Sequence, residues 1–143
     1  MRVWIGTTLL AVVLAAAGCG GDTAASAIYD GAGCTYDGPT AVSVGDEVRF
    51  TFTNESETTD VVFNVARLPE GTTQDDIFET GLDEISEGET ILDLFAPSPI
   101  GEERSDTATF ASAGLFGAAC TDFSGGENDG QGLSYVTLIE ATE

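Results

Sequence analysis

The segment 47–54, E-V-R-F-T-F-T-N, constrains the fold of this chain most strongly, because its side chains alternate strictly in character. Val48, Phe50 and Phe52 are apolar, whereas the residues between them are charged or hydroxylated. A period of two is typical of a β-strand that buries one face and exposes the other. The segment therefore predicts a half-buried strand.

Short segments of related character recur along the chain and are separated by turn residues. Further strands are expected at 27–29, 40–44, 60–68, 90–95, 106–110, 114–120 and 133–141, with a turn at 37–39. The segment T-T-Q-D-D-I-F-E-T differs, because a threonine followed three residues later by an acid is typical of a helix start. About seven or eight strands, with one short helix around residues 73–80, predict an all-β sandwich in one domain, residues 27–143.

The first 18 residues have the features of a secretory signal peptide. Arg2 precedes an apolar run of about 15 residues, which is shorter than the roughly 20 that a membrane-spanning helix needs. The run ends in A-A-G-C, which resembles the lipobox of bacterial lipoproteins, with Ala16 where the lipobox usually has Leu. The resemblance implies cleavage before Cys19 and attachment of a diacylglyceryl group to it. A plain signal peptide with an incidental cysteine is the alternative.

A lipid on Cys19 would place the protein outside the cytoplasm, anchored to the cell membrane. Two acyl chains suffice for stable anchoring, whereas one is marginal. Residues 19–26 are small and polar, and they are expected to form a flexible tether between the lipid and the domain.

Two cysteines remain after Cys19, and this even number allows them to pair with each other in one disulfide. Cys34 and Cys120 would lie in an oxidising compartment, where paired thiols become disulfides. A Cys34–Cys120 disulfide is therefore predicted, and a reactive thiol at Cys120 is the alternative.

The charge of the exported part is strongly negative. Three arginines oppose 25 acids after residue 19, a side-chain sum of −22, and the chain has no Lys and no His. Such a charge repels nucleic acids and anionic lipid surfaces, so neither is expected as a partner. An acidic surface without lysine is typical of adaptation to high salt, where screening lengths fall to a few Å. A moderately acidic, ordinary exported protein is the alternative.

Three stretches, TAVSVGDEVRFTFTNES, ASAGLFGAACTDF and LSYVTLIEA, resemble the cupredoxins, the family of plastocyanin and azurin. The similarity covers about residues 27–143 and implies a Greek-key β-sandwich. In this family a copper ion is held by two His, a Cys and often a Met. Cys120 matches the ligand cysteine by position, but the chain has no His and its only Met is Met1. The departure implies a cupredoxin-like domain without a redox copper site.

The same missing residue types exclude several classes of enzyme. A chain without His or Lys has no Ser–His–Asp triad, Cys–His pair or Ser–Lys dyad. Carboxylate chemistry remains, but the neighbouring acids at 75–76, 83–84 and 102–103 are interpreted as solvated charges. No catalytic residue is predicted, and a carboxylate-dependent enzyme is the third choice.

An acidic, glycine-rich loop follows Cys120. Asp122, Glu127 and Asp129 could supply oxygen ligands to Ca²⁺, which takes six to eight of them, although the spacing does not match an EF-hand. A solvated loop is the alternative.

The sequence thus predicts a non-catalytic binding or interaction module, anchored through Cys19. A monomer is expected, with an envelope protein or a small ligand as its partner. An accessory or structural envelope lipoprotein with cation-binding loops is the runner-up.

Overall fold

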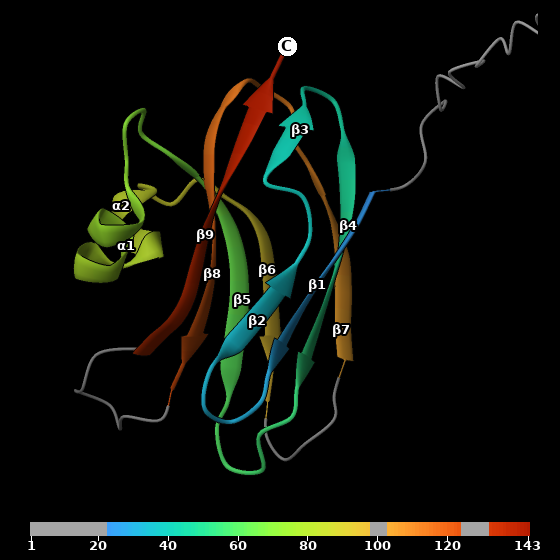
Figure 1. Cartoon of the computed structure of the whole chain (residues 1–143), viewed down its shortest axis with the longest axis vertical. Helices are drawn as coiled ribbons and strands as arrows, with labels where there is room; N and C mark the ends of the chain where they lie inside the picture. Colours follow the sequence, from blue (N-terminus) through green and yellow to red (C-terminus); the bar gives the residue numbers. More distant parts are fainter. Residues whose placement is uncertain (1–22, 98–102, 124–131) are drawn as a thin grey trace, which may run out of the picture.

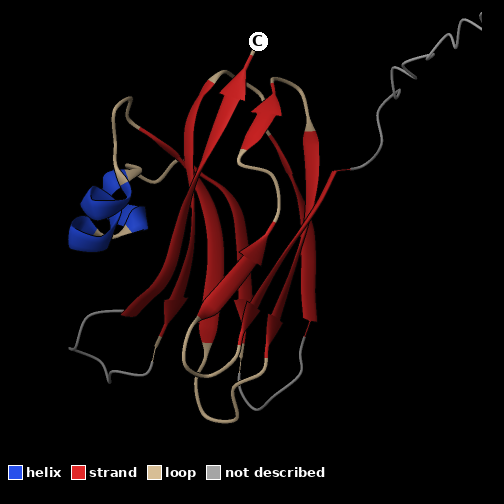
Figure 2. Ribbon diagram, viewed as in Figure 1, coloured by secondary structure: helices blue, strands red, loops and turns tan. Residues whose placement is uncertain are grey.

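The structure is a computed structural model that describes residues 23–97, 103–123 and 132–143. This part of the chain forms nine strands and two short helices, and the strands make two facing sheets (Figures 1 and 2). The predicted all-β sandwich is therefore confirmed.

Each sheet combines strands that are distant in sequence. The four-stranded sheet has the order β2 (Cys34–Asp37), β1 (Thr23–Tyr29), β4 (Glu47–Asn54), β7 (Glu103–Thr109). The five-stranded sheet has the order β3 (Ala41–Ser43), β9 (Gly132–Thr142), β8 (Gly114–Asp122), β5 (Val61–Leu68), β6 (Thr90–Ala96). Two neighbouring pairs are parallel, β1 with β4 and β3 with β9, and the other pairs are antiparallel.

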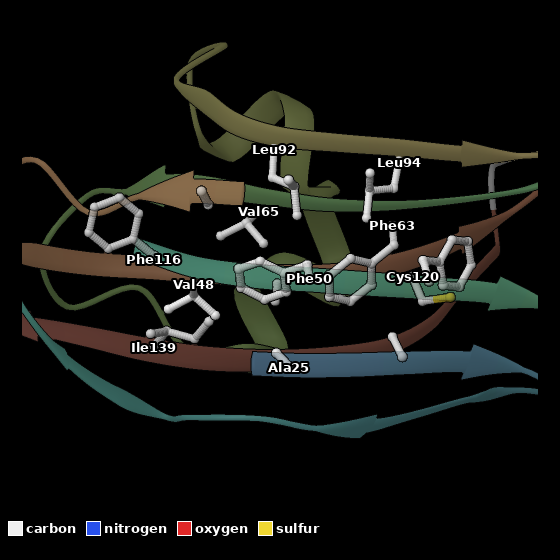
Figure 3. Packing of buried hydrophobic residues seen from close by; sticks show 14 of the residues in the cluster. Ala25, Val48, Phe50, Phe63, Val65, Leu92, Leu94, Phe116, Cys120 and Ile139 are labelled. Carbon is white, nitrogen blue, oxygen red and sulfur yellow. The ribbon is translucent and has the colours of Figure 1, made fainter. Parts of the chain in front are cut away.

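The main core lies between the sheets. The alternation that predicted β4 is confirmed, because Val48, Phe50 and Phe52 are buried and Glu47 and Arg49 are exposed. Phe63 of β5 lies at the centre of an aromatic cluster, with its ring centroid 5.9 Å from that of Phe50 and 5.7 Å from that of Phe52. Figure 3 shows the labelled core side chains extending from Phe116 at one end to Cys120 at the other.

A second, smaller core lies on the outer face of the five-stranded sheet. The helices α1 (Gln74–Thr80) and α2 (Leu82–Ile85) cover this face, as Figure 1 shows. Their buried residues Ile77 and Leu82 pack against Ala66 and Leu68 of β5 and against β8 and β9. The strand β5 is therefore buried on both faces, as the apolar segment 60–68 predicted.

Local hydrogen bonds determine where the helix pair begins. Thr73 caps α1 in a reciprocal capping box with Asp76, so the predicted helix start is confirmed. The backbone N–H of Thr73, and then its hydroxyl, donate hydrogen bonds to the Asp76 carboxylate, and these bonds lower the pKa of Asp76 below its ordinary value. Gly81 separates α1 from α2 with φ of +92°, a conformation that side-chain-bearing residues rarely adopt.

The structure corrects four details of the expected organisation. Nine strands are present in the described residues, and α2 follows the one expected helix. β2 was not predicted as a strand, and it extends into the first residue of the expected turn, Asp37. β1 begins at Thr23, so residues 23–26 pair with β4 instead of belonging to the tether of 19–26. The signal segment 1–18 and residues 19–22 lie outside the described residues.

No helix within residues 23–97, 103–123 and 132–143 combines the length and apolar character needed to cross a bilayer.

Candidate functional site

The two cysteines of the domain are joined in a disulfide, as the sequence predicted. Cys34 begins β2 in one sheet and Cys120 lies near the end of β8 in the other, with their Cα atoms 6.3 Å apart. Cys120 is fully buried, and Phe63 and Tyr135 are its neighbours in register on the adjoining strands. The bridge therefore joins the sheets within the main core.

This position is the one at which the family resemblance implied a copper ligand. The Cys120 thiol is bonded to Cys34, and the whole chain contains no His. Among the described residues, no group of three or more His, Cys, Asp or Glu side chains could hold a metal ion. The residues present therefore do not fit a type 1 copper ion.

Only one of the three acids proposed for Ca²⁺ lies in the described part of the chain. Asp122 ends β8, and its Oδ2 accepts a hydrogen bond from the Tyr29 hydroxyl at 3.3 Å. Burial of the phenol, and then the nearby Asp122 carboxylate, raise the pKa of Tyr29 above its ordinary value. Glu127 and Asp129 lie outside the described residues, so the predicted Ca²⁺ site stays a prediction.

A groove lies where the two helices cover the outer face of the five-stranded sheet. It encloses about 460 Å³, and its walls come from α1, from α2 and from strands β5, β8 and β9. The amide of Gln74 on α1 donates a 3.2 Å hydrogen bond to the Val136 carbonyl of β9. Together with the small apolar core beneath the helices, this bond positions the helical wall of the groove.

The groove combines a polar floor, an apolar wall and an acidic rim. Asn64 of β5 and Thr121 of β8 line it from the sheet, and Phe78 lines it from α1. Three carboxylates complete the rim: Glu79, Asp83 and Glu84. None of the described lining residues carries a positive charge, so the groove is electrostatically negative.

The sequence interpretation missed this groove. Asn64 is a polar residue inside the apolar segment V-V-F-N-V-A, and such an interruption was the one available signal. The pair Asp83–Glu84 was noted only as solvated charge, and both residues are indeed exposed. Because Asp83 and Glu84 are distant from Asn64 in the sequence, the sequence does not show that all three line one groove.

A second hollow, of about 480 Å³, lies beside Arg67. The guanidinium is already bound, because it donates to the Ser112 hydroxyl at 2.7 Å and to the Ala113 carbonyl at 3.2 Å. Its Nε also lies 3.8 Å from a carboxylate oxygen of Glu89. Arg67 therefore ties β5 to neighbouring loops.

Comparison with known proteins gives a structural likeness without a sequence match. No protein-family model matches the chain, and no curated protein matches it significantly. Reduced auracyanin from the photosynthetic bacterium Roseiflexus castenholzii is similar in structure, with a TM-score of 0.53 and 16% identity over 87% of this chain and 100% of the other. Reduced rusticyanin has a TM-score of 0.50 and 13% identity over 84% of this chain and 77% of the other. Both are cupredoxins, so the chain has a cupredoxin-like fold.

Proposed function

We propose that this protein is a lipid-anchored, extracytoplasmic binding module that has a cupredoxin-like fold but neither a redox copper ion nor a catalytic site. The observation that carries the proposal is the disulfide between Cys120 and Cys34. A thiolate used in a disulfide cannot ligate copper, and the chain has no His to complete a ligand set. Electron transfer through type 1 copper is therefore not the proposed role.

The disulfide also supports the proposed location. Structural disulfides persist in oxidising compartments, and they are rare in reducing ones. The bridge is consistent with export by the signal segment and with anchoring through Cys19. The partners that we propose are the membrane, through the lipid, and a small ligand or an envelope protein.

Two features support a role in binding over one in catalysis. The whole chain lacks the His and Lys that nucleophilic and general-base sites commonly use. Asp75 and Asp76 lie in the first turn of α1, where Asp76 serves the capping box. Asp83 and Glu84 are exposed in the first turn of α2.

Copper titration of the purified, non-reduced domain tests the proposal. We expect no intense visible absorption of a copper–thiolate bond when Cu²⁺ or Cu⁺ is added and the sample is then oxidised in air. A matched sample with Cys34 changed to Ala, which frees the Cys120 thiol, is also expected to stay colourless because no His is available. An intense thiolate-to-copper band in the native protein would contradict the proposal.

A further inference from the structure

We propose that the groove between the α1–α2 pair and the five-stranded sheet binds a small organic ammonium ion that carries a hydrogen-bonding group. This inference rests on the proposed binding function and names the ligand class for it.

The floor of the groove holds two polar side chains that make no hydrogen bond to another described residue. Asn64 is 6% exposed and Thr121 is 7% exposed, and neither side chain makes a hydrogen bond to the rest of the described chain. Within the same described part, no fully enclosed side-chain polar atom lacks a partner, so the polar atoms of these two residues open onto the groove. Solvent therefore reaches these polar atoms, and a ligand in the groove can replace that solvent with direct hydrogen bonds to them.

The neighbouring positions on the same face of β5 and β8 carry apolar residues instead of polar ones. Ala66 lies two residues along β5 from Asn64, and Ala119 lies two residues along β8 from Thr121. Both alanines point to the same face as these polar residues and pack beneath the helices. The change from apolar to polar side chains coincides with the opening of the groove, which is the arrangement expected of a polar subsite in a ligand pocket.

The wall of the groove presents an aromatic ring. Phe78 is 50% exposed, whereas its neighbour Ile77 is fully buried and holds α1 on the sheet. Leu133 of β9 adds apolar surface to the lining. An exposed aromatic ring attracts a cation through its π-face, by about 0.5–1 kcal/mol at exposed sites.

The charges on the rim of the groove determine which sign of ligand charge it favours. Glu79, Asp83 and Glu84 contribute three negative charges, and no described lining residue opposes them. An anion would therefore be repelled. A bare metal ion is not favoured either, because these acids do not form a metal-holding group in the described chain.

The size of the groove fits a small molecule. Its volume of about 460 Å³ falls within the roughly 300–1,000 Å³ that is usual for small-molecule sites. The ammonium group would lie between Phe78 and the rim acids, and the hydrogen-bonding group would reach Asn64 and Thr121.

The experiment uses the ammonium alcohols choline and ethanolamine as probes. The control probe is 3,3-dimethyl-1-butanol, which has the shape of choline without its charge. Each probe is titrated into the ¹⁵N-labelled domain at constant high NaCl, so that general screening of the acidic surface does not change. We expect saturable shifts of the Asn64 side-chain amide and of the backbone of α1 with at least one ammonium alcohol, and tenfold or weaker binding of the neutral alcohol.

Matched variants assign the binding to the groove. Asn64→Leu preserves side-chain volume and removes the polar group, so it should weaken binding about fivefold to tenfold without loss of folding. Phe78→Ala should weaken binding about threefold or more. Phe95→Ala is the control, because Phe95 is 49% exposed on β6 and does not line the groove.

Three outcomes would overturn the inference. One is equal binding of choline and the neutral alcohol, which would remove the selectivity for cations. Another is binding that keeps its wild-type strength in both Asn64→Leu and Phe78→Ala, which would place the ligand outside the groove. The third is the absence of saturable shifts at Asn64 with either ammonium alcohol. None of these outcomes affects the copper and membrane tests, so failure of the ligand assignment is distinguishable from failure of the proposed function.

Discussion

Cys34 and Cys120 are separated by 86 residues, but the disulfide brings their Cα atoms to 6.3 Å and joins the two sheets. The chain-entropy estimate for closing a loop of this length is about 4–5 kcal/mol, which would be a large part of the stability of a small domain. We expect the double variant Cys34→Ala, Cys120→Ala to lower the free energy of unfolding by about this amount or somewhat less. Guanidinium unfolding would measure the loss, and the wild type in reductant should show a similar one. Two alkylatable thiols in the denatured, non-reduced protein would contradict the prediction.

Asn54 is a fully buried amide whose hydrogen bonds connect both sheets. Its Nδ2 donates to the Thr59 carbonyl at 2.8 Å and to the Ala96 carbonyl at 2.9 Å, and its Oδ1 accepts from the Ser56 amide at 2.9 Å. Asn54→Asp would remove both donors and place a carboxylate against two carbonyl oxygens. We expect a loss of about 3 kcal/mol or more at neutral pH, measured by denaturant unfolding. The exposed neighbour provides the control Glu55→Gln, for which we expect a change within about 0.5 kcal/mol.

Tyr36 should be a late-titrating tyrosine. Burial, and then the nearby Tyr135 and Asp37, raise its pKa to about 12, from the ordinary value of about 10. Because the folded pKa is raised, the contribution of the neutral phenol to stability is complete below pH of about 10 and is lost as the pH rises through about 12. Ultraviolet absorbance of tyrosinate should show a late step that disappears in Tyr36→Phe. A late step of unchanged amplitude in this variant would contradict the assignment.

The unfolding midpoint should rise from low to molar NaCl. The side-chain sum after residue 19 is −22, and added ions screen the mutual repulsion of these charges. Thermal unfolding at several NaCl concentrations would measure the effect, and a midpoint independent of salt would contradict the high-salt interpretation. Millimolar Ca²⁺ compared with Mg²⁺ tests the predicted loop site. A saturable gain specific to Ca²⁺ should disappear when Asp122, Glu127 and Asp129 become Asn, Gln and Asn.

Cys19→Ser should release the protein from the membrane fraction. The change removes the thiol that would carry the diacylglyceryl group, and the apolar segment before it is too short to span a bilayer. Fractionation followed by detection of the protein would measure the release. Cys34→Ser is the control, since it changes a cysteine of the domain and should leave the protein on the membrane. Quantitative retention of Cys19→Ser would indicate another anchor.

The sequence predicted those parts of the fold whose signals are local. The alternation of Val48, Phe50 and Phe52 needs only its own strand, and the capping box of Thr73 needs only one helical turn. The short edge strand β2 was not predicted, because its pairing depends on β1 and its first residue is held by a disulfide to a distant strand. The start of β1 at Thr23 was missed for a similar reason, since small polar residues become a strand there only by pairing with β4.

The groove could not be predicted because it depends on contacts between distant segments. Gly117 of β8 illustrates this dependence, since a Cβ atom there would lie 2.9 Å from Cδ1 of Leu82 and 3.0 Å from Cδ1 of Leu68. The glycine is explained by the close approach of α2 to the sheet, which no local pattern reveals. The disulfide was predictable for a different reason, since only two cysteines remained to pair.

The parallel pairing of β1 with β4 has a mechanical consequence for an anchored domain. β1 is the first described strand after Cys19, and it is held by seven register pairs with β4 and four with β2. A force transmitted from the membrane to Thr23 and directed along the strand would load these pairs together in shear. Peeling the pairs apart one at a time would require a force directed across the strand. If the proposed anchor at Cys19 is present, β1 is therefore arranged to resist pulling along its own axis.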